Sequence, residues 1–68
     1  MKKLRELRKQ EGITMAQLAK EIGVSMHSVF RWELGKTSPT AKELVLLARR
    51  FNVTPNELLG VGDEKSPA

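Results

Sequence analysis

The stretch that decides the fold is residues 12–35, GITMAQLAKEIGVSMHSVFRWELG. Gly12, Gly23 and Gly35 divide it, and each stands where a segment with helical periodicity ends. Thr14 and Gln17 have the spacing of a capping box, in which each side chain can satisfy the other residue's free backbone N–H. The residues between Thr14 and Gly23 are therefore predicted to form a helix. Its apolar stripe follows the i, i+3, i+4, i+7 spacing: Met15, Leu18, Ala19 and Ile22.

A second helix follows after a very short connection. Ser25 is a natural N-cap for a helix over about residues 26–34, which Gly35 closes. Val24 alone separates Gly23 from Ser25, so the connection is too short to favour antiparallel packing of the two helices. A helix-turn-helix, with two helices crossing at a large angle around a turn that contains glycine, fits this spacing.

Three further helices are expected outside this stretch. One runs over about residues 2–11, one lies between the cap Thr40 and Asn52, and one lies between the cap Thr54 and Gly60. The last two begin with capping boxes, Thr40 with Glu43 and Thr54 with Glu57. Because no strand pair or repeat appears, the sequence predicts an all-α domain of five helices over residues 1–60. Residues 61–68 have no periodicity and are expected to form a flexible tail.

Composition excludes several classes of protein. The chain has 68 residues and no cysteine, so it holds one small domain without disulfides or thiolate metal sites. His27 is the single histidine and the acidic residues are scattered, so we expect no metal and no cofactor. His27 also lacks a paired nucleophile, and neither a glycine-rich phosphate loop nor a carboxylate pair is present, so we do not expect an enzyme. No apolar run approaches the roughly 20 residues of a membrane span, and we expect a cytoplasmic protein with no membrane contact.

Positive charge is concentrated in the first half of the chain. The formal net charge is +4, and residues 1–36 contain eight basic and four acidic residues. An anionic partner is therefore expected to meet this half.

The helix over residues 26–34 has an unusual outward side. On a helical wheel of about 100° per residue, Val29, Trp32 and Ser25 share the inward side. The outward side carries one cation, one imidazole and two large apolar groups: His27, Phe30, Arg31 and Leu34.

A DNA major groove offers partners for these groups. Arg31 can donate two bonds to a guanine, His27 can bond a base edge, and Met26 or Phe30 can touch a thymine methyl. The alternative is that Phe30 and Leu34 form a protein interface or pack under a loop, and that Arg31 is an ordinary surface charge.

Glu33 falls on the buried side of the same wheel. An unpaired carboxylate there would be costly, so Glu33 needs a cation. Arg8 lies one residue beyond the Leu4 and Leu7 stripe and is the best candidate. We predict an Arg8–Glu33 pair that holds the first helix against the third; the alternative is that both side chains point to water.

Residues 4–59 resemble the phage repressor and Cro-like helix-turn-helix family, also called the XRE family of transcriptional regulators. The resemblance rests on an ordered set of short pieces at the family spacing. They are LRELR (4–8), GIT (12–14), QLA (17–19), IGVS (22–25), RWE (31–33), GK (35–36), PT (39–40), LA (47–48) and VTPNELL (53–59).

This resemblance implies a five-helix bundle of the phage-repressor type, in which the helix over residues 26–34 enters the major groove by its N-terminal end. The family's base-reading positions fall on Ser25, Met26, His27 and Arg31, and its phosphate contacts on Met15, Leu34, Lys36 and Thr37. The side chains of Met15 and Leu34 cannot bond a phosphate, although backbone N–H groups at the start of the second helix could. Basic residues of the first helix, Arg5 and Lys9 among them, are expected to supply other phosphate contacts; the alternative is a solvated face.

The sequence thus predicts a sequence-specific DNA-binding regulator, a repressor that occupies a palindromic double-stranded operator. Useful specificity implies a homodimer, and the resemblance implies that its surface lies on the C-terminal helices. Leu46, Leu59 and Val61 could form an apolar patch there; the alternative is an isolated surface leucine. The alternative function is an antitoxin or another protein-binding helical module, with a protein partner and with DNA binding secondary.

Overall fold

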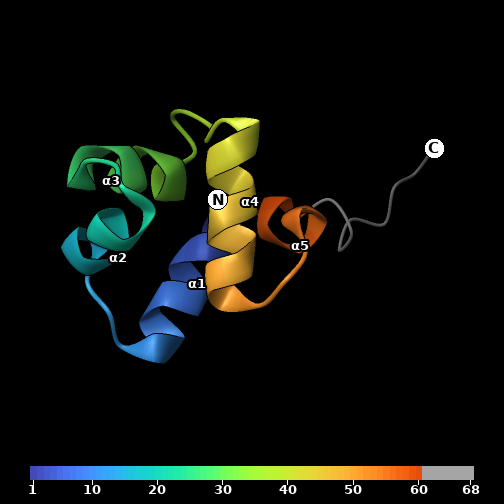
Figure 1. Ribbon diagram of the computed structural model, residues 1–68, viewed down its shortest axis with the longest axis horizontal. Coiled ribbons are helices and arrows are strands. Elements are labelled where there is room, and N and C mark those ends of the chain that lie inside the picture. Colours follow the sequence, from blue (N-terminus) through green and yellow to red (C-terminus); the bar gives the residue numbers. More distant parts are fainter. Residues whose placement is uncertain (61–68) are drawn as a thin grey trace.

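The computed structural model describes residues 1–60 of the chain. Over these residues it contains five helices and no strand (Figure 1). Their bounds are α1 Lys2–Glu11, α2 Met15–Ile22, α3 Met26–Leu34, α4 Ala41–Phe51 and α5 Pro55–Leu59. The predicted all-α, five-helix fold is confirmed. The expected tail lies outside the described residues.

Capping boxes define where three of the helices begin. At the start of α2, the Thr14 N–H donates to Gln17 Oε1 at 2.8 Å and the Gln17 N–H donates to Thr14 Oγ1 at 3.0 Å. The same reciprocal pairs open α4 and α5, at Thr40 with Glu43 and at Thr54 with Glu57. Each box satisfies two backbone donors that have no acceptor inside the helix. Helix boundaries are therefore encoded locally.

The connection between α2 and α3 is a tight turn of three residues. Gly23 ends α2 in the left-handed conformation with φ 89°, which a side chain would disfavour. The N–H groups of Gly23 and Val24 both donate to the Ala19 carbonyl, at 2.8 and 2.9 Å. Ser25 then caps α3 by accepting from the Ser28 N–H. The two helices consequently lie next to each other at one end of the molecule (Figure 1).

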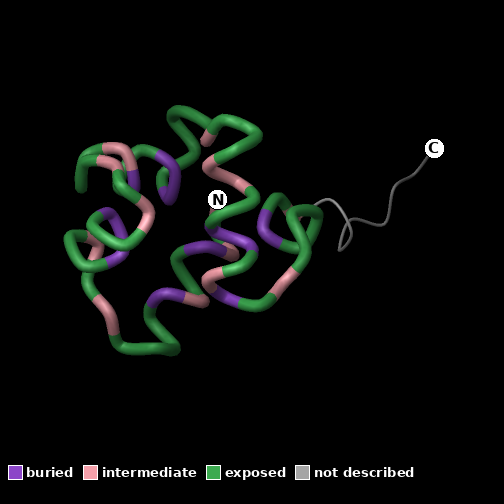
Figure 2. The backbone as a smooth tube through the Cα atoms, viewed as in Figure 1, coloured by how far each residue is buried: buried purple, intermediate pink, exposed green. Residues whose placement is uncertain are grey.

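One apolar core is shared by all five helices. Its buried members are Leu4, Leu18, Ala19, Val29, Trp32, Leu47, Ala48, Phe51 and Leu58. Helix α3 packs against α1 and α2, while α4 packs against α2 and α5. Figure 2 shows the buried segments of the chain turned toward one another. Since α3 is supported from one side, its other side is left exposed.

Candidate nucleic-acid interface

Helix α3 is anchored by two fully enclosed apolar side chains. Val29 is 0% exposed and Trp32 is 2% exposed. Both were placed inward by the sequence. Ser25 was placed inward as well, and that prediction was wrong: Ser25 is exposed. As the N-cap, it has an extended backbone, φ −79° and ψ 156°, so it falls outside the register of the helical wheel.

The opposite side of α3 faces solvent. His27 and Arg31 are exposed, and Met26 and Phe30 expose 47% and 45% of their surface. Together with Ser25 at the N-cap, the five side chains predicted to read bases are therefore all exposed on α3 or at its start. They present one hydroxyl, one imidazole, one guanidinium and two large apolar groups.

The side chains expected near phosphates lie on three separate segments. Lys36 and Thr37 are exposed just beyond the end of α3, and Arg5 and Lys9 are exposed on α1. Met15 is half-buried and packs against the core at the start of α2. Of this set, Met15 thus offers only its backbone N–H to a phosphate.

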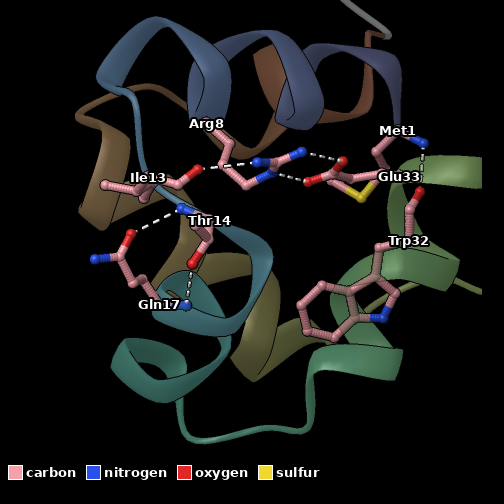
Figure 3. Close-up of polar contacts among 7 residues, drawn as sticks. All are labelled: Met1, Arg8, Ile13, Thr14, Gln17, Trp32 and Glu33. Carbon is pink, nitrogen blue, oxygen red and sulfur yellow. Dashed lines mark hydrogen bonds and ion pairs between the residues drawn. The ribbon is translucent and has the colours of Figure 1, made fainter.

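A buried ion pair fixes α3 against α1 (Figure 3). Arg8 Nε donates to Glu33 Oε2 at 2.6 Å and Arg8 Nη2 donates to Glu33 Oε1 at 3.1 Å. The two side chains are only 9% and 2% exposed. The structure thus brings Arg8 and Glu33 together in a bidentate geometry, which restricts both the distance and the rotation between the two helices.

The third nitrogen of the Arg8 guanidinium also has a partner. Arg8 Nη1 donates to the Ile13 carbonyl at 2.9 Å, in the turn between α1 and α2. The hydrogen bond to Glu33 raises the pKa of Arg8 above its ordinary value, so the guanidinium stays charged. Among residues 1–60 no buried side-chain nitrogen or oxygen lacks a partner. The pair is therefore a fully bonded buried network.

The amino group of Met1 makes a second contact with α3. It donates to the Trp32 carbonyl at 2.5 Å (Figure 3). Trp32 lies in the last turn of α3, where its carbonyl also accepts from the Gly35 N–H at 3.1 Å and where positive charge is favoured. The sequence analysis did not find this contact.

Arg50 on α4 joins the C-terminal ends of two other helices. Its Nη1 lies 2.8 Å from Glu11 Oε1, and its Nε pairs with Glu21. Hydrogen bonds to Glu21 and to Glu11 raise the pKa of Arg50. The sequence analysis missed this network, although a signal existed. Glu11 and Glu21 stand at helix C-termini, where a negative charge is unfavourable without a nearby cation.

Residues 1–60 contain no group of three His, Cys, Asp or Glu side chains that could hold a metal ion. None of the helices in this range has the length and apolar character needed to cross a membrane.

Comparison with known proteins identifies the arrangement. The family described as Helix-turn-helix matches residues 4–58. The chain belongs to this helix-turn-helix family. The matched range contains all of α2 and α3 and both members of the Arg8–Glu33 pair. The resemblance that the sequence motifs indicated is confirmed.

Relatives of this helix-turn-helix protein include both an activator and a repressor of transcription. It is 38% identical over 65 residues to the uncharacterized HTH-type transcriptional regulator YobD of Bacillus subtilis, covering 96% of this chain and 58% of the relative. It is 39% identical over 62 residues to the HTH-type transcriptional activator BcrR of Enterococcus faecalis, covering 91% of this chain and 30% of the relative. It is 38% identical over 58 residues to the cryptic phage CTXphi transcriptional repressor RstR of Vibrio cholerae, covering 85% of this chain and 52% of the relative.

The chain therefore spans 58% or less of these three relatives' own lengths. No solved structure matches the chain at a comparable level.

The buried pair leads to a stability prediction. Arg8→Met leaves the Glu33 carboxylate buried without a cation, and we expect a loss of about 3–5 kcal/mol in the free energy of unfolding. Replacing both partners, Arg8→Met with Glu33→Leu, should recover part of this loss because no buried charge remains. Urea unfolding followed by the fluorescence of Trp32, the single tryptophan, measures both variants. Arg49→Met, at an exposed position of α4, is the control and should change stability by less than about 0.5 kcal/mol. A double variant as unstable as Arg8→Met would contradict the prediction.

Proposed function

We propose that this helix-turn-helix protein is a sequence-specific DNA-binding transcriptional repressor that places α3 in the major groove. The observation that carries the proposal is the exposed side of α3, with base-reading groups held on a helix whose inward side is locked by Trp32 and Glu33. Repression rather than activation is supported by the phage repressor among the relatives.

The roles on α3 follow from side-chain chemistry. Arg31 donates two hydrogen bonds to a guanine, since its planar guanidinium matches the two acceptors on that base. His27 bonds a base edge, and Ser25 does so at the N-terminal end of the helix. Met26 and Phe30 contact thymine methyl groups. Base choice therefore depends on one full cation and several uncharged neighbours.

Phosphate contacts come from the segments around α3. Lys36 and Thr37 follow it directly, Arg5 and Lys9 lie on α1, and the Met15 N–H opens α2. Because these positions lie on three segments, they can meet the backbone on more than one side of the groove that α3 occupies. They supply affinity and orientation, and the exposed side of α3 supplies the choice of sequence.

A dimer is the second part of the proposal. Leu46 on α4 and Leu59 on α5 expose 37% and 45% of their surface, and Val45 exposes 40%. A twofold dimer through α4 and α5 would cover these groups and set two copies of α3 about 34 Å apart, one turn of DNA. The operator is then palindromic. Val61, which the sequence also placed in this patch, lies outside the described residues.

The operator itself can be found by selection. Duplexes that bind the full chain are recovered from a random pool and sequenced. Palindromic sites with a constant half-site spacing are expected; an unstructured pool with no preferred sequence would contradict sequence-specific binding.

Lys36→Gln tests the phosphate contacts. Affinity should fall by a similar factor on the selected operator and on random duplex, because a phosphate contact carries no sequence information. The slope of log affinity against log salt should fall by about 1. Fluorescence anisotropy at several salt concentrations measures both quantities. Operator binding that is insensitive to ionic strength would contradict a phosphate-driven interaction.

Arg31→Ala tests base reading. We expect a loss of about 1–3 kcal/mol on the selected operator and little loss on random duplex. Arg49→Ala, which removes an exposed arginine of α4, is the matched control and should leave the ratio of specific to random affinity unchanged. Equal losses on both duplexes would reassign Arg31 to the phosphate backbone.

Leu46→Glu tests the dimer. A carboxylate in an apolar twofold interface meets its own copy, so sedimentation should show a shift to monomer and cooperative binding to the palindrome should disappear. Affinity for a single half-site should stay the same. Lys20→Glu, an exposed change on α2, is the control for added negative charge. A Leu46→Glu protein that remains dimeric would move the interface elsewhere.

A further inference from the structure

An apolar groove lies where α1, α2 and α3 meet. It is lined by Arg5 of α1, Met15 of α2, and Phe30, Glu33 and Leu34 of α3. Phe30 and Leu34 are 45% and 55% exposed, so two large apolar side chains form an open wall. Base reading by Arg31 does not require this groove.

The groove continues an apolar stripe along α3. Met26, Phe30 and Leu34 are spaced four residues apart, so they follow one another along the same side of the helix. They are three of the six large apolar side chains exposed within residues 1–60. An exposed apolar patch of this kind, bordered by polar groups, is typical of an interaction site.

The apolar side chains of the groove do not suit a phosphate, which in the proposed DNA complex contacts only Arg5 and the Met15 N–H here. The side chains of Met15 and Leu34 have no hydrogen-bond donor, so they cannot compensate a phosphate for the water that it would lose. An apolar side chain of a partner fits between them better. The stripe therefore indicates a partner that presents apolar groups at helical spacing.

The cations around the groove favour a partner with negative charge. Arg5 lines it, and Lys2 and Lys9 lie three and four residues from Arg5, on the same side of α1. The carboxylate of Glu33 is already bonded to Arg8 through both oxygens, so its negative charge is compensated. An apolar floor beside cations is complementary to an apolar segment that carries carboxylates.

We propose that this groove binds an acidic amphipathic helix of a protein partner. An apolar side chain of that helix sits between Met15, Phe30 and Leu34, and its carboxylates face Arg5 and Lys9. Because Phe30 also belongs to the proposed base-reading surface, the partner and operator DNA exclude each other, and partner binding releases the operator. Only this last step rests on the proposed function; binding of the helix to the groove does not.

The test starts from a displayed library of random helical peptides selected on the full chain. Enriched peptides should combine apolar residues at i, i+3 and i+4 spacing with Asp and Glu on the flanks. A peptide from that pool is then labelled, and its affinity for variants is measured by fluorescence anisotropy. Enrichment of basic peptides, of peptides without the apolar spacing, or of none would overturn the proposal.

Leu34→Asn and Leu34→Met form a matched pair of variants. Both replace the same exposed leucine of the groove, and only Leu34→Asn removes its apolar surface. Leu34→Asn should weaken peptide binding about tenfold or more, since burial of apolar surface is lost, and Leu34→Met should change it less than about twofold. Thermal unfolding of both variants checks that they fold. Equal effects of the two variants would overturn the groove as the binding site.

Competition with DNA separates this proposal from the proposed function. Unlabelled operator should displace the labelled peptide, and the peptide should release labelled operator. Simultaneous binding of both would overturn the exclusion. A protein that binds no DNA sequence selectively, but binds the acidic peptide through Leu34, would refute the repressor function and leave the groove assignment in place.

Discussion

The buried guanidinium of Arg8 is the interaction on which the rest of the structure depends. A charge at this depth is tolerable because each of its three nitrogens donates to an acceptor: Nε and Nη2 to the two oxygens of Glu33 on α3, and Nη1 to the Ile13 carbonyl before α2. One side chain of α1 therefore holds the start of the helix-turn-helix and the end of its second helix. Apolar contacts around Val29 and Trp32 would keep α3 attached but are non-directional. The bidentate pair adds direction, so it determines which side of α3 meets solvent.

The other charged contacts have a different role. Arg50 crosses from α4 to Glu11 and Glu21, at the C-terminal ends of α1 and α2, and its side chain is 28% exposed. Partly exposed pairs of this kind contribute little free energy individually. Their position matters more, because they neutralise two carboxylates that the helix dipoles disfavour. Together with the Met1 amino group at the end of α3, they compensate charge at the C-terminal ends of three helices.

The sequence predicted what local chemistry determines. Helix boundaries follow from caps within a few residues, as at Thr14 with Gln17, and the Arg8–Glu33 pair follows from burial of a carboxylate that must find a cation. Ser25 was misplaced because a helical wheel assumes helical backbone, which an N-cap lacks. The contacts of Arg50 and Met1 depend on how distant segments pack, and no spacing along the chain encodes them. The groove could not be predicted from spacing along the chain either, because its walls come from three helices.

Charge and apolar surface are separated on the proposed interface, and this separation affects which partner is bound. The cations Arg5, Lys9 and Lys36 belong to other segments, whereas α3 itself exposes Met26, Phe30 and Leu34 with Arg31 as its one cation. Binding of DNA to such a surface depends strongly on salt, because counterions are released along the whole contacted duplex. A short acidic helix has fewer charges and gains more from apolar burial, which salt does not screen. Rising ionic strength therefore weakens DNA binding more than peptide binding, and the same side of α3 favours the protein partner as salt increases.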